Sequence, residues 1–208
     1  PLAQNALSYR SGWLWFIGWF TIALIGSYFL NPAIDIILIA AAILEIIYVM
    51  LLKVTYLRTF VSGFVKSSGP IAAIFVVDPS PAPTLVLLVL AWVFFWEIGG
   101  QNIPADWNDT VEDKRVNAKT IPIHFGTKRA GQIVVVTLSV TSVLSLLLPM
   151  ASPLNLGWAY LLASAASAGY LLLRPGLQLA NGQEGRQAAA LFDNASFYPM
   201  AQLLIITI

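Results

Sequence analysis

Three aspartates with helical spacing are the residues best suited to chemistry in this 208-residue chain. Asp106, Asp109 and Asp113 follow Pro104, a residue that fits the first turn of a helix. On one helix these positions, i, i+3 and i+7, share a face. Converging carboxylates repel each other unless a cation lies among them, and oxygen ligands suit Mg²⁺, which commonly bridges carboxylates to phosphates. The spacing therefore favours a Mg²⁺ site for a phosphorylated substrate.

The same segment carries positive charge that could meet the rest of the phosphate. These basic residues are Lys114, Arg115 and Lys119. A plainer explanation of the acids is also open, because the helix dipole favours carboxylates in a first turn and charged connections between apolar segments are common. That explanation accounts for Asp106 and Asp109 more easily than for Asp113. The residues alone leave both interpretations standing.

The elements that must position these residues are apolar. Hydrophobic residues make up 58% of the chain and charged residues 10%, whereas a soluble domain carries about 25% charged residues. No charge occurs over residues 11–34, 79–96 or 130–173. A bilayer crossing needs about 20 apolar residues. The chain is therefore an integral, multi-pass membrane protein.

Seven apolar segments are expected to cross the membrane, and they cover residues 12–30, 33–52, 60–78, 83–103, 130–150, 155–173 and 189–208. Their apolar runs are continuous, which indicates helices rather than the alternating strands of a barrel. The sequence thus predicts an all-α fold, a polytopic transmembrane helical bundle forming one domain over residues 1–208. The longest connection, residues 102–129, contains the aspartates and nine of the 21 formal charges.

The basic residues predict the orientation of the bundle. With seven crossings, all eleven fall on the side of the 102–129 connection, and they are Arg10, Lys53, Arg58, Lys66, Lys114, Arg115, Lys119, Lys128, Arg129, Arg174 and Arg186. The opposite connections, near residues 31–32, 79–82 and 151–154, contain none. By the positive-inside rule, the aspartate-rich loop faces the cytoplasm.

Composition excludes several other classes of site. The chain has no cysteine, so it has neither a disulfide framework nor a thiolate nucleophile. Its single histidine, His124, rules out a multi-histidine zinc site. The formal net charge of +1 gives no overall attraction to nucleic acid, which we do not expect as a partner.

The aspartate-rich segment resembles a motif of a known family. Residues 106–126 read DWNDTVEDKRVNAKTIPIHFG, and this string is similar to the second aspartate-rich motif of the UbiA superfamily of intramembrane prenyltransferases. In that family the motif lies on a cytoplasmic loop, continues into a Lys/Arg-Thr/Ser-x-Pro-like stretch and closes with glycine. Four predicted spans before the loop and three after it agree with the resemblance.

Family members typically have nine helices, with a first motif of the form Asn-Asp-x-x-Asp-x-x-x-Asp after the second helix. An Arg-Pro-Leu-like sequence usually follows that motif, and this chain opens on Pro1-Leu2-Ala3. The resemblance therefore implies seven helices of a nine-helix fold, in a chain that begins just after the first motif and is truncated at its N-terminus.

The resemblance also implies roles for individual residues. Asp106, Asp109 and Asp113 would bind Mg²⁺ as the catalytic metal ligands. Lys53, Arg58 and Lys119 would contact the diphosphate of a prenyl donor, although membrane anchoring explains Lys53 and Arg58 equally well. The family has a Tyr-x-x-x-Lys element on the preceding cytoplasmic connection. Here the corresponding stretch from Tyr48 to Lys53 is one residue longer, which weakens the transfer of that role to Tyr48.

Three polar residues just before the motif are further candidates for substrate binding. Glu97 and Gln101 lie at i and i+4 at the end of the fourth span and are expected to line the mouth of the acceptor pocket, or else to form interhelical bonds. Asn102 would contact the diphosphate or cap the helix that restarts at Pro104.

The implied activity is transfer of a polyprenyl group from a prenyl diphosphate to a hydrophobic acceptor within the lipid bilayer. The acceptor would be an aromatic compound or a quinone precursor, as in quinone biosynthesis. Two alternatives stay open. One is a non-catalytic relative that acts as a membrane scaffold or binding protein, and the other is a transporter, which would place ionisable residues near the middle of the bilayer.

Overall fold

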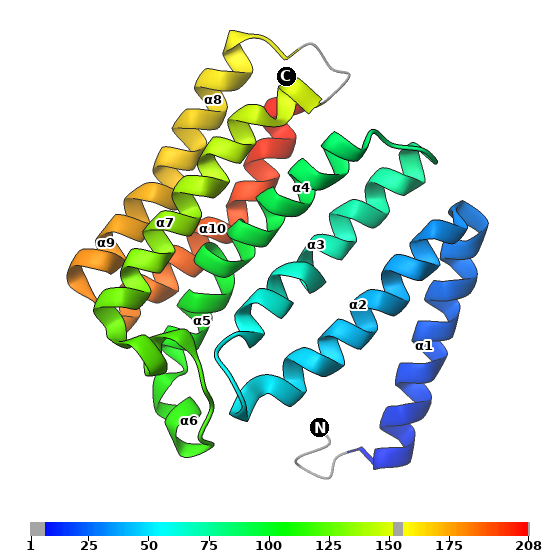
Figure 1. Ribbon diagram of the computed structural model, residues 1–208, viewed down its shortest axis with the longest axis horizontal. Helices are drawn as coiled ribbons and strands as arrows, with labels where there is room; N and C mark the ends of the chain where they lie inside the picture. Colours follow the sequence, from blue (N-terminus) through cyan, green and yellow to red (C-terminus); the bar gives the residue numbers. More distant parts are fainter. Residues whose placement is uncertain (1–6, 152–155, 208) are drawn as a thin grey trace.

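The computed structural model describes residues 7–151 and 156–207, and in this part the chain is a bundle of helices without strands (Figure 1). The first half contains α1 (Tyr9–Leu30), α2 (Pro32–Met50), α3 (Arg58–Val77), α4 (Pro83–Trp96), α5 (Ile103–Asn108) and α6 (Thr110–Arg115). The second half contains α7 (Ile121–Ala151), α8 (Trp158–Ala168), α9 (Arg174–Gly182) and α10 (Gly185–Thr207). The predicted all-α polytopic bundle is confirmed.

Two of the long rods contain a π-helical segment, and α7 itself consists of two helices that meet at a kink at Gly126. A π-helical segment, Glu97–Asn102, joins α4 to α5 without a break, and a second one, Gly169–Leu173, joins α8 to α9. Each of the seven predicted spans coincides with one helical rod. In the described part, five rods are long and apolar enough to cross a membrane by length and composition. The predicted limits at residues 155 and 208, and the opening residues 1–3, lie outside the described residues.

The rods run side by side, so their connections gather at two ends of the bundle (Figure 1). The α2–α3 connection, α6 and the α9–α10 connection lie at one end, whereas the α1–α2 and α3–α4 connections lie at the other. The connections rich in Lys and Arg therefore share an end, as the sequence predicts. The assignment of that end to the cytoplasm stays a prediction.

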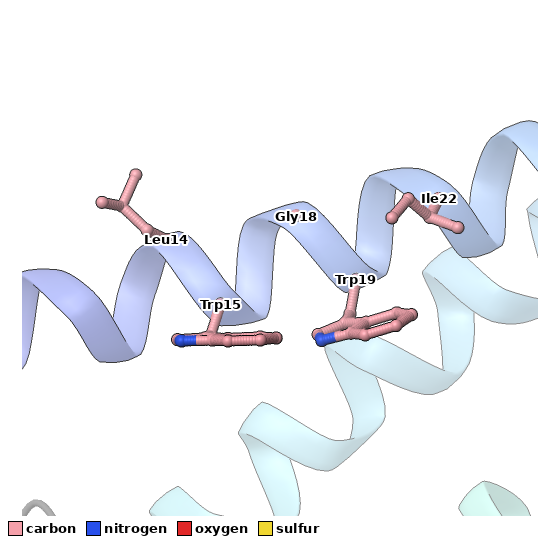
Figure 2. Close-up of a pocket in the computed structure, with 5 residues that line it drawn as sticks. All are labelled: Leu14, Trp15, Gly18, Trp19 and Ile22. Atoms are coloured by element: carbon pink, nitrogen blue, oxygen red, sulfur yellow. The ribbon is translucent and has the colours of Figure 1, made fainter. Parts of the chain in front are cut away.

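Helix α1 lies at the margin of the bundle and packs mainly against α2. Its surface has an apolar groove that includes Trp15, Gly18 and Trp19 (Figure 2). The two indole rings are stacked, with their centroids 6.2 Å apart. Large apolar side chains exposed along a helix of this length suit contact with lipid rather than with water.

Most of the buried apolar core lies between the second-half helices, the first π-helical segment and α5. Ile103, Leu138, Leu172 and Leu191 are fully buried there, from α5, α7, the second π-helical segment and α10 respectively. This core forms one wall behind the aspartate-rich segment. It fixes α5 against α10 and α7, and so it fixes the backbone that carries Asp106.

Close approach of α7 to α9 depends on Gly131. A Cβ atom built at Gly131 would lie 2.8 Å from the Cα of Ala180, which is backbone and cannot rotate away. We expect Gly131→Ala to destabilise the protein by about 1–3 kcal/mol, the usual penalty of overpacking. Thermal unfolding in nanodiscs would measure it, with Gly26→Ala in α1 as the control because nothing lies within 4 Å of that position. Equal melting temperatures for the two variants would contradict this close contact.

The expected single helix from Pro104 to Asp113 is wrong in detail. The helix does not restart at Pro104, because the π-helical segment continues directly into α5, and the Asn102 side chain makes no capping bond. Pro104 has no N–H to donate to the Gly100 carbonyl, and the Gln101 side-chain amide donates to that carbonyl instead, at 3.1 Å. The helix then breaks at Asp109, between α5 and α6.

Candidate functional site

A buried ion pair lies at the centre of the candidate site. The Nη2 atom of Arg58, in the first turn of α3, lies 2.6 Å from Oδ1 of Asp106 in α5. The two side chains are 8% and 9% exposed. Removing a charge from water costs free energy unless a partner compensates it, and here the two buried groups compensate each other. The pair links the α2–α3 end of the bundle to the first residue of the aspartate motif.

Tyr48 and Asn102 complete one side of this cluster. The guanidinium of Arg58 lies 4.8 Å from the centroid of the Tyr48 ring, in a cation–π contact. The Nδ2 atom of Asn102 donates to the Tyr48 hydroxyl at 3.3 Å. The structure thus brings Tyr48, Arg58, Asn102 and Asp106 together from α2, α3, the first π-helical segment and α5.

Glu97 lies in the first π-helical segment and is 4% exposed. Its Oε1 atom accepts a hydrogen bond of 2.6 Å from the Ser62 hydroxyl of α3. Four residues further along, Gln101 donates to the Phe192 carbonyl of α10 at 3.2 Å. π-Helical insertions are common at functional sites because one extra residue changes the direction of the side chains that follow.

A cavity of about 270 Å³ opens beside these residues. Most of its lining residues carry polar groups, and they come from four parts of the chain. The lining residues are Glu45, Tyr48, Ser62, Lys66, Glu97, Gln101, Asn102, Ala105 and Phe192. All the substrate-binding residues expected in the fourth span and in α2 therefore face one cavity, next to the Arg58–Asp106 pair.

The aspartates differ in environment. Asp106 is buried, Asp113 is half-buried and Asp109 is exposed. The Oδ2 atoms of Asp106 and Asp113 are buried without a hydrogen-bond partner. Partial burial raises the pKa of Asp113, and the charges of Asp109 and Glu112 raise it further, against the lowering effect of Arg58.

Two unpartnered carboxylate oxygens on one motif suit a hard cation that prefers oxygen ligands. Within residues 7–151 and 156–207, no group of three or more His, Asp or Glu side chains is close enough to hold a metal ion as it stands. The donor atoms of Asp106 and Asp113 therefore fit a divalent cation that also takes ligands from water or a substrate phosphate. The metal-binding roles of Asp106, Asp109 and Asp113 stay predictions.

The two lysines expected at the diphosphate lie at the edge of the cluster. Both side chains are exposed, and Lys53 ends the short 3-10 turn Leu51–Lys53. The backbone N–H of Lys119 donates to the Leu52 carbonyl at 2.8 Å. This bond ties the chain after the motif to the end of α2, so Lys53 and Lys119 lie on adjacent stretches of backbone.

Ser62 and Phe192 were not predicted from the sequence, and Lys66 counted only toward the orientation of the bundle. Ser62 is an uncharged residue in an apolar span, and no motif marks it. Its role depends on a contact between α3 and the first π-helical segment, residues 35 positions apart. Only the polar residues Ser62 and Lys66, four positions apart in a largely apolar span, could have drawn attention to this face.

The fold and the site together define a polytopic helical membrane protein with a buried polar cluster at one end of an apolar bundle. A model of the UbiA prenyltransferase family matches residues 1–198. The chain therefore belongs to the UbiA prenyltransferase family, which confirms the resemblance drawn from the aspartate-rich motif.

A solved structure from a study of the biosynthesis of digeranylgeranylglyceryl phosphate synthase in membranes shares the fold. It matches with a TM-score of 0.75 and 19% sequence identity, over 99% of this chain and 71% of that chain. No curated protein matches the sequence. At this identity the likeness shows the common fold alone, with the seven rods in the same arrangement as the corresponding part of that chain.

Proposed function

We propose that this protein transfers a polyprenyl group from a prenyl diphosphate to a hydrophobic acceptor within the bilayer. The observation that carries the proposal is the buried Arg58–Asp106 pair, with its unpartnered carboxylate oxygen, at the polar end of an apolar bundle. Membership of the UbiA prenyltransferase family supports it. A diphosphate group needs positive charge, which Arg58 and a cation bound by Asp106 would supply, and an isoprenoid tail needs an apolar surface.

Each polar residue of the cluster has a task in this proposal. Asp106, Asp109 and Asp113 would hold Mg²⁺, which neutralises diphosphate charge when it is bound. Arg58 would exchange part of its contact with Asp106 for a diphosphate oxygen, because its Nε atom is buried without a partner. Lys53 and Lys119, on adjacent backbone, would cover the outer face of the diphosphate.

Water must be kept from an allylic cation, since water would capture it before the acceptor does. The walls around the cluster are apolar or aromatic, and the long helices extend the apolar surface away from the charges. Tyr48 contacts Arg58, and both Tyr48 and Asn102 line the polar cavity. The donor diphosphate would therefore bind at the Arg58–Asp106 pair, and an acceptor ring of aromatic or quinone-precursor type in the adjacent cavity.

Donor binding to the full-length protein in lipid nanodiscs tests the proposal. We expect a non-hydrolysable prenyl thiodiphosphate to bind in the presence of Mg²⁺ and to bind at least tenfold more weakly without it. The double substitution Asp106→Asn with Asp109→Asn should abolish the Mg²⁺ effect. Glu112→Gln is the matched control, because this carboxylate is exposed on α6 beside the motif. Binding that ignores both the metal and the two aspartates would contradict the proposal.

A non-catalytic binding protein is the second candidate. Two observations favour it: Arg58 already compensates Asp106, and the described residues contain no group of three carboxylates. Such a protein would bind a prenylated lipid without turnover. The same titration, repeated with the neutral prenyl alcohol, separates the candidates. A scaffold would bind the alcohol as tightly as the thiodiphosphate.

A further inference from the structure

A second groove, with a volume of about 400 Å³, lies at the start of α7 and apart from the polar cluster. Its lining residues are Phe125, Arg129, Gln132, Ile133, Val136 and Thr137. Thr137 packs against Gly99 of the first π-helical segment, because a Cβ atom built at Gly99 would lie 2.2 Å from the Thr137 Oγ1 atom. Glu97, Gln101 and Asn102 of the same segment line the polar cavity instead. The groove and the cavity therefore lie on different faces of this segment.

The polar end of the groove lies at the kink of α7. Gly126 has φ 77° and ψ 165°, and a new helical segment follows it. Phe125, just before the kink, and Ile133, about two turns after it, both line the groove. The Phe125 ring packs on Tyr56 of the α2–α3 connection, with the ring centroids 4.8 Å apart. The groove thus begins at the end of the bundle where the basic connections gather (Figure 1).

The polar end of the groove carries positive charge without an acidic partner. Arg129 lines it, and Lys128 precedes Arg129 in the same helical turn. The sequence has no Asp or Glu from residue 114 to residue 183, and Glu184 is exposed. Among the described residues, neither Lys128 nor Arg129 forms an ion pair. Both cations also lie at the positive end of a helix dipole, which disfavours them. An anion from outside the chain would therefore be attracted by the side chains and by the dipole.

The remainder of the groove is apolar and continues into an exposed stripe. Ile133 is half-buried, and Val136 is 62% exposed. Beyond Val136, the exposed residues Val143 and Leu147 follow on the same face of α7. From Val136 to Leu147 the helix rises about 16 Å at 1.5 Å per residue, which is about half of a hydrocarbon core that is about 30 Å thick. The stripe therefore matches an acyl chain in one leaflet of a bilayer.

From this combination we infer that the groove binds an anionic phospholipid of the surrounding bilayer, with its phosphate at Arg129 and one acyl chain along Ile133 and Val136. The planar guanidinium group offers several N–H donors, which suit the oxygens of a phosphate. The Gln132 amide adds hydrogen-bonding groups for the rest of the headgroup. No acid lines the groove to meet the ammonium group of a zwitterionic headgroup. A lipid with net negative charge is therefore preferred.

Two lipids that differ in headgroup charge but share their acyl chains test this inference. The full-length protein in a nonionic detergent would be titrated with dioleoylphosphatidylglycerol or dioleoylphosphatidylcholine, and native mass spectrometry would measure the lipid-bound fraction. We expect the phosphatidylglycerol to bind about fivefold more tightly, the factor that one basic group near a membrane surface contributes. A photoreactive diazirine on its acyl chain should label the peptide that contains Val136.

Variants assign this preference to the groove. Arg129→Gln should reduce the ratio of the two Kd values from about fivefold to less than twofold. Lys128→Gln is the matched control, because it removes the same charge from a neighbouring residue that does not line the groove, and it should keep most of the preference. Val136→Trp should weaken binding of both lipids by filling the groove. Val49→Trp should not, although Val49 of α2 is equally exposed, at 61%. All four side chains are exposed, so the variants should fold normally.

Several results would overturn the inference. These are equal affinity for the two lipids, equal effects of Arg129→Gln and Lys128→Gln, and labelling confined to other helices. Displacement of the lipid by millimolar inorganic phosphate would also overturn it, because Arg129 would then bind a free anion. None of these results bears on the proposed function, since the groove contains no residue of the Arg58–Asp106 cluster.

Discussion

Replacing Asp106 by asparagine is expected to reduce the rate of prenyl transfer by about 10²–10³-fold, the usual loss when one charged group that stabilises a transition state is removed. Asp106 is the buried aspartate of the motif, and its Oδ2 atom lacks a partner. In a buried position water cannot replace the lost ligand or screen the lost charge. The rate would be measured as release of pyrophosphate from a prenyl diphosphate by the full-length protein in nanodiscs.

The three aspartates should differ in importance according to their burial. Asp113→Asn, at a half-buried position with a second unpartnered oxygen, should give an intermediate loss. Asp109→Asn should give the smallest loss of the three, because water can replace part of an exposed ligand. Glu112→Gln should change the rate less than about twofold, as expected for a solvated surface charge. If Asp106→Asn behaved like Glu112→Gln, the aspartates would not be metal ligands.

The sequence predicted the bundle well because the signal for a membrane span is local. Continuous apolar runs bounded by charged or proline-containing turns determine where each rod begins and ends. Even the third span, which contains Lys66 and Pro70, forms the unbroken helix α3. Lys66 lies about two turns from the polar end, so its ammonium group can reach the cavity there. The lengths of the apolar runs and the positions of the turns between them are therefore enough to predict the membrane-spanning helices.

The residues that the structure gathers in this cluster were among the candidates named from the sequence, but the way they pair was not predicted. Tyr48, Arg58, Asn102 and Asp106 were all expected near a diphosphate, yet nothing in the sequence indicated that Arg58 and Asp106 would pair. Arg58 belongs to the first turn of α3 rather than to an open loop, and its guanidinium lies against the face of the Tyr48 ring. Contacts between distant segments depend on how helices pack, which local patterns do not determine.

The π-helical segment explains the largest local error. A proline five residues after Gly99 predicts a new helix start at Pro104, because the ring removes one backbone donor. The chain instead continues as one rod through Glu97–Asn102 into α5. Glu97, at the start of this segment, accepts from Ser62, and Asn102, at its end, donates to Tyr48. Both ends of the π-helical segment therefore line the cavity.

Replacing Arg58 by methionine is expected to destabilise the protein by about 3–5 kcal/mol, the loss seen when one partner of a buried ion pair is removed. Methionine fills similar space, so the effect comes from the Asp106 carboxylate, which would be left in a buried position without its counter-charge. Thermal unfolding in nanodiscs would report it as a fall in Tm of about 10 °C. Arg186→Met is the matched control, because Arg186 is exposed at the start of α10.

The double variant decides whether the pair or the arginine alone is responsible. Arg58→Met combined with Asp106→Asn removes both charges, so the protein should recover most of the stability lost in Arg58→Met, even though two substitutions are present. A double variant that is more stable than the sum of the two single losses predicts requires the two side chains to interact in the folded protein. Additive losses would mean that Arg58 stabilises α3 through its contact with Tyr48 instead. The double variant should remain inactive in either case, because stability would return without the carboxylate that the proposed chemistry needs.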